Sequence, residues 1–172
     1  MAWQIDGPVI VPFDFSDHSR AAFMHAVQLT TPENIHVVHV LPVFTPTEPG
    51  VGWGLIDDAQ RFSQTAKAME NEIPPDDFDG VNFHVLLGDP GTVVADLAVQ
   101  LDAELIAVGS HGRTGLSRLV VGSVAERVSR LAPCPVLLVK LPRQESEAEV
   151  EEHTEQGQTS DSDAVSEASV PS

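Results

Sequence analysis

Five short apolar runs, separated by longer amphipathic segments, constrain the fold of this chain more than any other feature of its sequence. The runs are rich in valine, isoleucine and leucine and have the length of β-strands. They are VIVPF (9–13), IHVVHVL (35–41), VNFHVLL (81–87), LIAV (105–108) and VLLV (136–139). We therefore expect five strands.

Helical patterns lie between these runs. Segment 16–29 opens with residues that cap helices and continues with apolar side chains at helical spacing, and segments 93–101 and 124–131 repeat that spacing. A strand followed by a helix, four times over, predicts right-handed crossovers. The fold class that we predict is α/β, a three-layer open twisted parallel sheet with helices on both faces.

The polarity of each run indicates where its strand lies in the sheet. Runs 9–13 and 105–108 are apolar throughout, as strands buried on both faces must be. Run 81–87 starts with apolar and polar residues in alternation, which is typical of an edge strand. Run 136–139 comes last and is also expected at an edge, yet it has no polar alternation. Because an uncovered apolar edge promotes aggregation, we expect a second copy to cover it in a homodimer.

Length and charge divide the chain into two parts. Its 172 residues, 42% of them hydrophobic, suffice for one domain with a core but hardly for two. Residues 143–172 carry one arginine against nine acidic residues and show no sustained apolar period. We predict a domain at 1–142 and an acidic disordered tail at 143–172, with a segment that folds on a partner as the alternative.

The composition also restricts partners and location. A formal net charge of −17 disfavours nucleic acids and membrane surfaces as general partners. Cys134 is the only cysteine, which excludes an internal disulfide and fits a reducing compartment. We see no signal peptide and no run near the roughly 18 apolar residues of a membrane span, so we expect a cytoplasmic protein. The acidity fits either a salt-adapted cell or an ordinary acidic surface and tail.

The stretch GSHGRTGLSRLVVGSVAER (109–127) begins where the fourth strand ends. In an open parallel sheet, ligands bind beyond the carboxyl ends of the strands, where the strand order reverses. Gly109 and Gly112 bracket two residues whose backbone amides can point into one concavity. Gly122 and Ser123 precede a helix whose first-turn amides and dipole favour an anion. This geometry fits a phosphate chain.

Each of these features also has a plain structural explanation. Ser123 and Glu126 have the spacing of a capping box, so they could simply start a helix. Asp14, just after the first strand, could cap the following helix, although its place at the predicted ligand edge favours ligand binding. Arg113 and Arg118 could contact the phosphates or be solvated loop residues.

Three pieces of the chain resemble one known family. Gly109-x-x-Gly112, nine residues and Gly122-Ser123 match the G-x-x-G-x9-G-[ST] pattern of the nucleotide-binding universal stress proteins. APCPVLLVK (132–140) resembles the closing strand of that family, and VIVPFDFSDHS (9–19) resembles its opening strand. The pieces stand in the family's order, and the resemblance covers residues 7–140.

This resemblance implies an adenine nucleotide alpha hydrolase-like fold with strand order 3-2-1-4-5. It also implies a dimer joined through strand 136–139, with ATP, or AMP or ADP, across the ends of the first and fourth strands. Mg²⁺ would be held mainly by the phosphates. Carried over by motif position, Pro12 and Asp14 would lie against adenosine and Val40 would close the adenine pocket, while Val108, Gly109, Ser110, His111 and Gly112 would line the ribose and first phosphates, and Gly122, Ser123 and Val124 would hold the phosphate end.

The sequence offers no strong device for catalysis. The P-loop pattern G-x-x-x-x-G-K-[ST] is missing, so efficient ATP hydrolysis is not predicted. Ser110 and His111 suggest a nucleophile and a base, but adjacent residues seldom point together and no nucleophile elbow surrounds them. His36 and His39 would lie on opposite faces of a strand and could not share a metal ion. We expect no catalytic residue and no metal site built by the protein alone.

The function predicted from the resemblance is that of a nucleotide-dependent sensor or regulator in the stress response. Nucleotide occupancy, not turnover, would then signal to a protein partner that the sequence does not identify. Two alternatives remain open. One is a slow nucleotide hydrolase or nucleotidyl transferase with His111 as its base. The other is a protein-interaction module whose site stays empty and whose acidic tail recruits the partner.

Overall fold

The computed structural model describes residues 4–44, 57–73, 78–111 and 121–141, all of which belong to one compact unit, Met1–Leu141. The predicted acidic tail at 143–172 lies outside the described residues and stays a prediction. None of the helices within the described part of the chain is long and apolar enough to cross a membrane.

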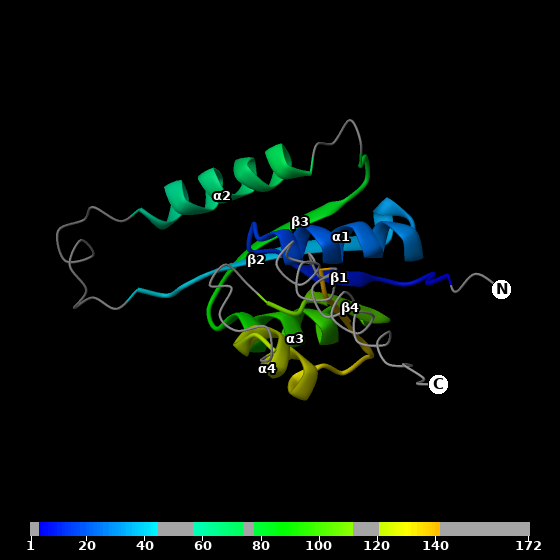
Figure 1. Ribbon diagram of the computed structural model, residues 1–172. Helices are drawn as coiled ribbons and strands as arrows, with labels where there is room; N and C mark the ends of the chain where they lie inside the picture. Colours follow the sequence, from blue (N-terminus) through cyan, green and yellow to red (C-terminus); the bar gives the residue numbers. More distant parts are fainter. Residues whose placement is uncertain (1–3, 45–56, 74–77, 112–120, 142–172) are drawn as a thin grey trace, which may run out of the picture. The chain divides into compact units, whose positions relative to one another are not determined.

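Five parallel strands form one sheet in the order β3-β2-β1-β4-β5 (Figure 1). They are β1 (Val9–Pro12), β2 (Ile35–Leu41), β3 (Asn82–Leu87), β4 (Leu105–Gly109) and β5 (Val136–Val139). The predicted order 3-2-1-4-5 is therefore confirmed, and each predicted run is a strand to within a residue at either end. The run with polar alternation, β3, lies at one edge of the sheet, and β5 lies at the other.

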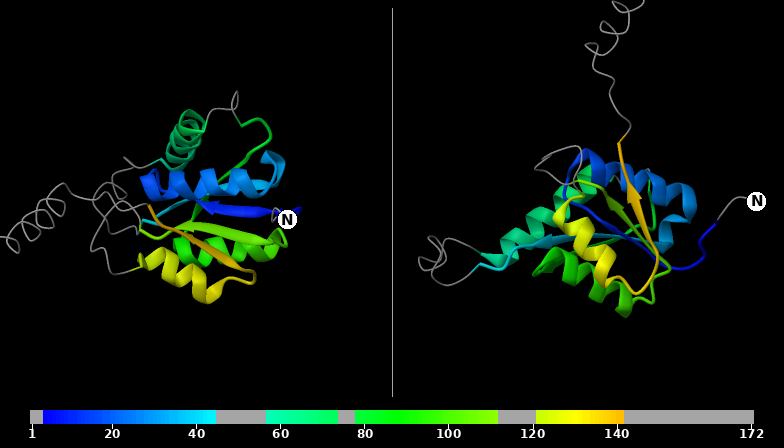
Figure 2. Two further views of the ribbon diagram at one scale, coloured as in Figure 1. Left: turned by 45° about the vertical axis from the view of Figure 1, so that its right-hand side comes forward. Right: turned by 60° about the horizontal axis from the view of Figure 1, so that its bottom comes forward.

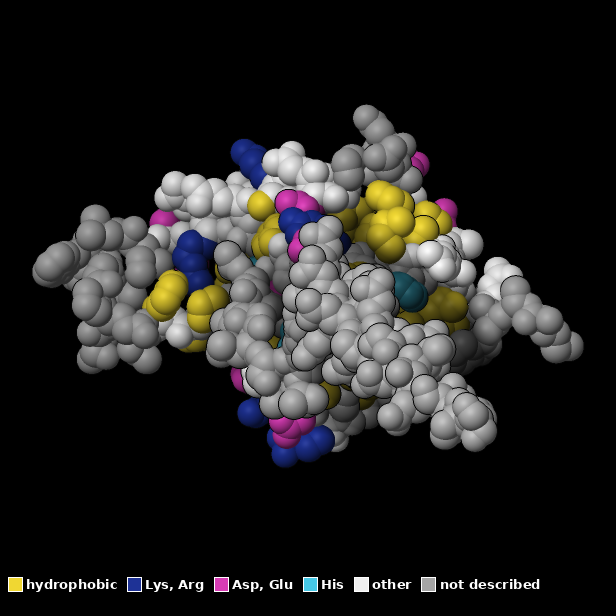
Figure 3. All heavy atoms as spheres, in the orientation of Figure 1, with side chains coloured by type: hydrophobic (Ala, Val, Ile, Leu, Met, Phe, Trp, Pro, Cys, Tyr) yellow, Lys and Arg dark blue, Asp and Glu magenta, His cyan; other side chains and the backbone are white. Residues whose placement is uncertain are grey.

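Helices cover both faces of the sheet, as predicted. They are α1 (Asp17–Leu29), α2 (Asp58–Glu72), α3 (Pro90–Gln100) and α4 (Ser123–Leu131), and a short 3₁₀ helix, η1 (Pro32–Asn34), leads into β2. Figures 1 and 2 show α1 and α2 on one face and α3 and α4 on the other. On the outer surface of α4, charged side chains of both signs face away from the sheet (Figure 3).

Two apolar clusters, one on each face, hold these layers together. Successive side chains of a strand point to opposite faces, so β1 contributes Val9 and Val11 to the cluster beneath α1 and Ile10 to the cluster beneath α3. Phe23 of α1 belongs to the first cluster and Val94 of α3 to the second. β1 is thus buried on both faces, as its sequence predicted.

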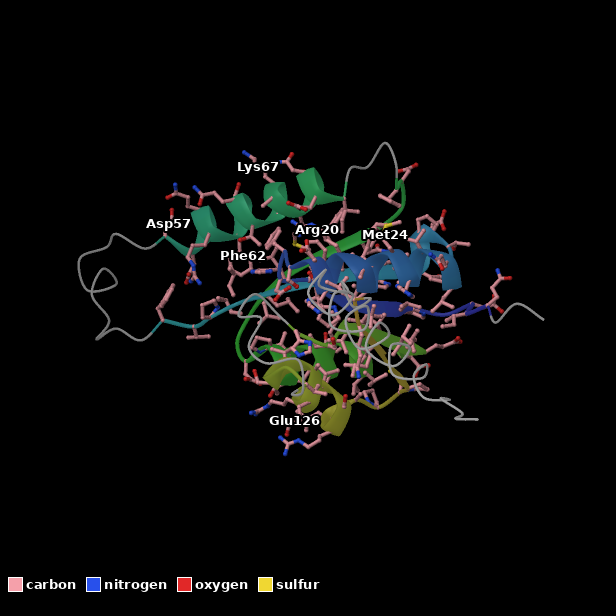
Figure 4. The ribbon with its side chains drawn as sticks, viewed as in Figure 1. Arg20, Met24, Asp57, Phe62, Lys67 and Glu126 are labelled. Atoms are coloured by element: carbon pink, nitrogen blue, oxygen red, sulfur yellow. The ribbon has the colours of Figure 1, made fainter. Side chains whose placement is uncertain are left out.

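An ion pair adds to the packing of α1 against α2. Arg20 reaches from α1 toward α2, where its Nε lies 2.7 Å from Oε2 of Glu72 (Figure 4). This hydrogen bond raises the pKa of Arg20 and lowers the pKa of Glu72. The pair is largely open to solvent, so it adds little to stability, and apolar burial remains the main contribution.

Candidate functional site

A cavity of about 260 Å³ lies at the carboxyl ends of β1, β2 and β4. This is the edge at which the strand order reverses, so the structure has a cavity where the topology predicts a ligand. The residues that line the cavity are Pro12, Phe13, Asp14, Ser19, Val38, His39, Val40, Pro90, Val94, Val108, Gly109, His111, Gly122, Ser123, Val124 and Ala125.

Most of the residues predicted at the site come together around this cavity. Those that line it are Pro12, Asp14, Val40, Val108, Gly109, His111, Gly122, Ser123 and Val124. Ser110 is not among the lining residues. Gly112 and Arg113, and Arg118 as well, lie outside the described residues.

Part of the apolar wall was not predicted. Val38 lies on β2, and Pro90 and Val94 lie in the first turns of α3. The topology could have predicted the two α3 residues. A helix that follows a parallel strand starts near the carboxyl end of that strand, which is where ligands bind. Together these side chains give the cavity an apolar side, which suits a flat and weakly polar group.

The N-terminus of α4 supplies the polar side of the cavity. Its N-cap is Gly122, and no side chain caps this end of the helix, whereas Ser16 caps α1 and Asp89 caps α3. Ser123 is therefore the first residue of the helix and not its cap, so the capping box considered above does not form. The first-turn amides have no partners within the helix, and the helix dipole favours negative charge. An anion fits this end of the cavity.

Ser110 differs from its predicted place beside the ribose and phosphates. It is buried, and its amide donates to the Val139 carbonyl at 2.8 Å, because Ser110 continues β4 alongside β5. Its carbonyl accepts from the Gly122 amide at 2.8 Å, so that amide already has a partner. Its Oγ lies 3.0 Å from Nδ1 of His111, which corrects the expectation that the two side chains would not meet.

Gly109 has a packing role that its motif did not reveal. A Cβ on Gly109 would come within 2.8 Å of the backbone carbon of His18 and 2.9 Å of its carbonyl oxygen. The first turn of α1 therefore packs directly on the end of β4. The ring of His18 also lies 5.2 Å from the ring of His111. Gly109 thus has two effects on the cavity. It lets α1 pack closely on β4, and its lack of a side chain leaves space in the cavity wall.

The start of α3 is held against α4 beside the cavity. Asp89 caps α3 by accepting from the amide of Thr92 at 3.0 Å and from its hydroxyl at 2.8 Å, and these bonds lower the pKa of Asp89. The Asp89 carboxylate also lies 3.0 Å from Nε of Arg127 on α4. A Cβ on Gly91 would meet side-chain atoms of Arg127 at 2.7 Å, so glycine permits this close approach.

Asp14 is not the cap of α1. Its Oδ1 accepts hydrogen bonds from the amide of Ser16 at 3.1 Å and from the hydroxyl of Ser16 at 2.6 Å. Ser16 is the actual cap, since its Oγ accepts from the amide of Ser19. Asp14 thus supports the cap from outside the helix while it lines the cavity.

Comparison with known proteins gives consistent matches. Residues 7–140 match the model of the universal stress protein family. Universal stress protein MJ0531 of Methanocaldococcus jannaschii is 37% identical over 150 residues, which cover 80% of this chain and 84% of that protein. Universal stress protein YxiE of Bacillus subtilis is 30% identical over 144 residues, which cover 77% of this chain and 97% of that protein.

Solved structures share the same fold. The structure of MJ0577, from Methanocaldococcus jannaschii, superposes with a TM-score of 0.65 at 22% identity and covers 84% of this chain and 100% of that one. Universal stress protein UspA from Lactobacillus plantarum superposes with a TM-score of 0.60 at 24% identity, covering 77% of this chain and 97% of that one.

Proposed function

This chain belongs to the universal stress protein family and has a role in the stress response, and we propose that it binds ATP in the cavity at the carboxyl ends of β1, β2 and β4. The filled or empty site, and not turnover of the nucleotide, is the signal that a protein partner reads. A cytoplasmic location is part of the same proposal. The proposal that the chain binds ATP is supported by the chemistry of the cavity.

One observation carries the proposal: a single cavity joins an apolar wall to a helix N-terminus that no side chain caps. Adenine is flat and apolar on its faces, and it fits against the apolar wall that Val40 of β2 and Pro90 of α3 line. The phosphates fit at the amides of Ser123 and Val124, where the dipole of α4 favours negative charge. Asp14 and Pro12 lie between these two ends of the ligand, beside the ribose.

The glycine motif agrees with this orientation. Val108, Gly109 and His111 line the wall between the base and the phosphates. Gly122 lets the phosphates approach the backbone closely but donates no hydrogen bond to them, because its amide already donates to the carbonyl of Ser110. Ser110 supports the site from behind by tying the two ends of the motif together. In this proposal Gly112 and Arg113 complete the phosphate end.

A structural neighbour supports an adenine nucleotide as the class of ligand. A universal stress protein with this fold was solved in complex with cAMP, and it superposes with a TM-score of 0.53 at 20% identity, covering 81% of this chain and 98% of that one. AMP and ADP carry the same base and ribose as ATP and compete for the proposed site. Their relative affinities depend on how many phosphates reach α4.

Magnesium would accompany ATP through the phosphate oxygens. Within the described part of the chain, no group of three or more His, Cys, Asp or Glu side chains could hold a metal ion. Magnesium prefers phosphate and water ligands to a cage of protein side chains. The sequence also has no P-loop pattern G-x-x-x-x-G-K-[ST], whose lysine stabilises the transferred phosphate. We therefore expect turnover well below about 1 per second, the low end for ordinary enzymes.

A homodimer through β5 is the second part of the proposal. Val136, Leu137 and Leu138 are only half-buried in the single chain, although all are apolar. Leu131 and Leu141, which flank this edge in sequence, are exposed. A second copy that pairs along β5 would bury these side chains and remove the open sheet edge.

Calorimetric titration of the full chain with ATP and Mg²⁺ tests the binding proposal. We expect one site per chain and loss of binding in Gly122→Val, because a branched side chain fills the space that the phosphates approach. Gly157→Val makes the same change in the predicted tail and should bind like the parent. If the parent does not bind ATP, the proposal is wrong. The interaction module with an empty site then becomes the better account.

A further inference from the structure

The loop between β1 and α1 carries Asp14 to the cavity through an unusual backbone conformation. Phe15 has a φ of 65°, in the left-handed region. A bulky aromatic residue rarely adopts this conformation, because its Cβ crowds the following carbonyl oxygen. Among the described residues other than glycine, Phe15 shares a positive φ only with Asp102. Contacts elsewhere must hold Phe15 in this state.

Two aromatic contacts hold the Phe15 ring. It meets the Phe13 ring edge to face, with the centroids 5.4 Å apart at 74°. It also meets the His39 ring, with the centroids 5.0 Å apart at 52°. His39 lies near the end of β2, so a residue of the neighbouring strand braces the turn.

His39 also holds the loop through a hydrogen bond. Its Nδ1 lies 2.6 Å from the carbonyl oxygen of Phe13. A carbonyl only accepts, so Nδ1 carries the proton and donates. The amide of Phe13 in turn donates to the carbonyl of Val38 at 2.8 Å. Both backbone groups of Phe13 are thus bound to β2.

Asp14 stands between these fixed points. Phe13 precedes it and is tied to β2, while Ser16 follows Phe15, binds Oδ1 of Asp14 and caps α1. We propose that His39 and Phe15 are positioning residues that present Asp14 to the nucleotide: His39 holds the Phe13 carbonyl, and the Phe15 ring holds the left-handed turn. This inference rests on the proposed nucleotide site.

The expected consequence is a loss of preorganisation. A loop that is already ordered loses less conformational entropy when the ligand binds than a loop that must be ordered by the ligand. Removing the Phe15 ring leaves the cavity lining in place, whereas His39 is itself a lining residue. Either change frees Asp14 to sample other positions, and the cycle with Asp14 separates this effect from a direct contact of His39 with the nucleotide. Affinity for the nucleotide should therefore fall, because binding must then order the loop that carries Asp14.

Four variants of the full chain separate these roles. His39→Phe keeps the ring and removes the donor, whereas His39→Asn keeps an N–H donor near the position of Nδ1 and removes the ring. Phe15→Asn tolerates a left-handed φ but has no ring to pack. Asp102→Gly is the matched control, because Asp102 has the other positive φ. Asp102 lies in the turn before β4, at the amino ends of the strands, whereas the cavity lies at their carboxyl ends.

Titration with ATP and Mg²⁺ should order the variants. We expect His39→Phe and Phe15→Asn to raise the dissociation constant about tenfold, which corresponds to about 1.4 kcal/mol. His39→Asn should lose less than His39→Phe, and Asp102→Gly should bind like the parent. Circular dichroism reports folding, and if one of the two braces cannot be changed without unfolding, the other decides.

A double-mutant cycle asks whether His39 acts through Asp14. In an Asp14→Asn background, His39→Phe should cause little further loss, because the group that it positions is already changed. The same tenfold loss in that background would overturn the inference, as would parent-like binding by folded His39→Phe and Phe15→Asn. Failure of the parent to bind ATP would instead refute the proposed function itself.

Discussion

Gly109→Ala should destabilise the protein in the absence of any nucleotide. The Cβ of alanine would lie 2.8 Å from the backbone carbon and Cβ of His18 and 2.9 Å from its carbonyl oxygen. Two of these atoms are backbone, so a rotamer change cannot relieve the contact and the first turn of α1 must move away from β4. Overpacking of this kind costs about 1–3 kcal/mol.

That cost is large enough to measure by thermal unfolding. For a domain of this size, 1 kcal/mol corresponds to a change in Tm of roughly 3–5 °C, so Gly109→Ala should lower Tm by about 3–15 °C. Gly122→Ala is the control from the same motif, because Gly122 has a φ of −60°, which any residue can adopt. We expect Gly122→Ala to change ATP affinity far more than the Tm of the nucleotide-free protein.

The two glycines therefore separate packing from ligand binding. If Gly109 served only to let a phosphate approach, Gly109→Ala would keep the Tm of the parent in the absence of nucleotide. That result, confirmed by scanning calorimetry with the nucleotide removed, would refute the reasoning from the contact between α1 and β4. A lowered Tm with Gly109→Ala alone would support it.

Three further predictions concern other parts of the fold. Gly91→Ala should push α3 away from Arg127 on α4, and we expect weaker ATP binding in titrations together with a lower Tm; parent-like values of both would contradict this. Leu138→Asp should convert the dimer to a monomer in sedimentation experiments, and a parent that sediments as a monomer would remove the dimer proposal. His36 and His84 share a hydrogen bond of 3.0 Å, and burial lowers the pKa of both. The folded state therefore binds protons at these two histidines less readily than the unfolded state does. The contribution of the neutral pair to the free energy of unfolding is present above pH 6.5 and is lost as pH falls through the lowered pKa values. Tm should thus drop more steeply below pH 6.5 in the parent than in His84→Gln, and equal slopes would exclude this pair as the cause.

The fold was predictable because each strand is a separate apolar run. Polar alternation in 81–87 and its absence in 9–13 indicated an edge strand and a central strand, and the structure has β3 and β1 in those places. These patterns are local, since a strand buried on both faces cannot carry polar side chains wherever its neighbours come from. The strand order itself came from the family resemblance and not from periodicity.

The site was predictable where the chain motif itself contributes residues, and less so where distant segments meet. Spacing alone suggested that Ser123 caps α4, but Gly122 is the N-cap, because a capping box and a first helical turn have similar residue patterns. Ser110 lies in the motif, yet its backbone amide donates to the carbonyl of Val139 on β5, a bond that depends on the pairing of β4 with β5. The contact of Phe15 with His39 joins the loop after β1 to strand β2 and has no signature in the sequence.

The most direct test of the central claim is a crystal structure of the full chain grown with ATP and Mg²⁺. We predict the adenine against Val40 and Pro90 and the phosphates at the amides of Ser123 and Val124, in front of the N-terminus of α4. A nucleotide bound elsewhere, or a cavity that stays empty at saturating ATP, would contradict this account.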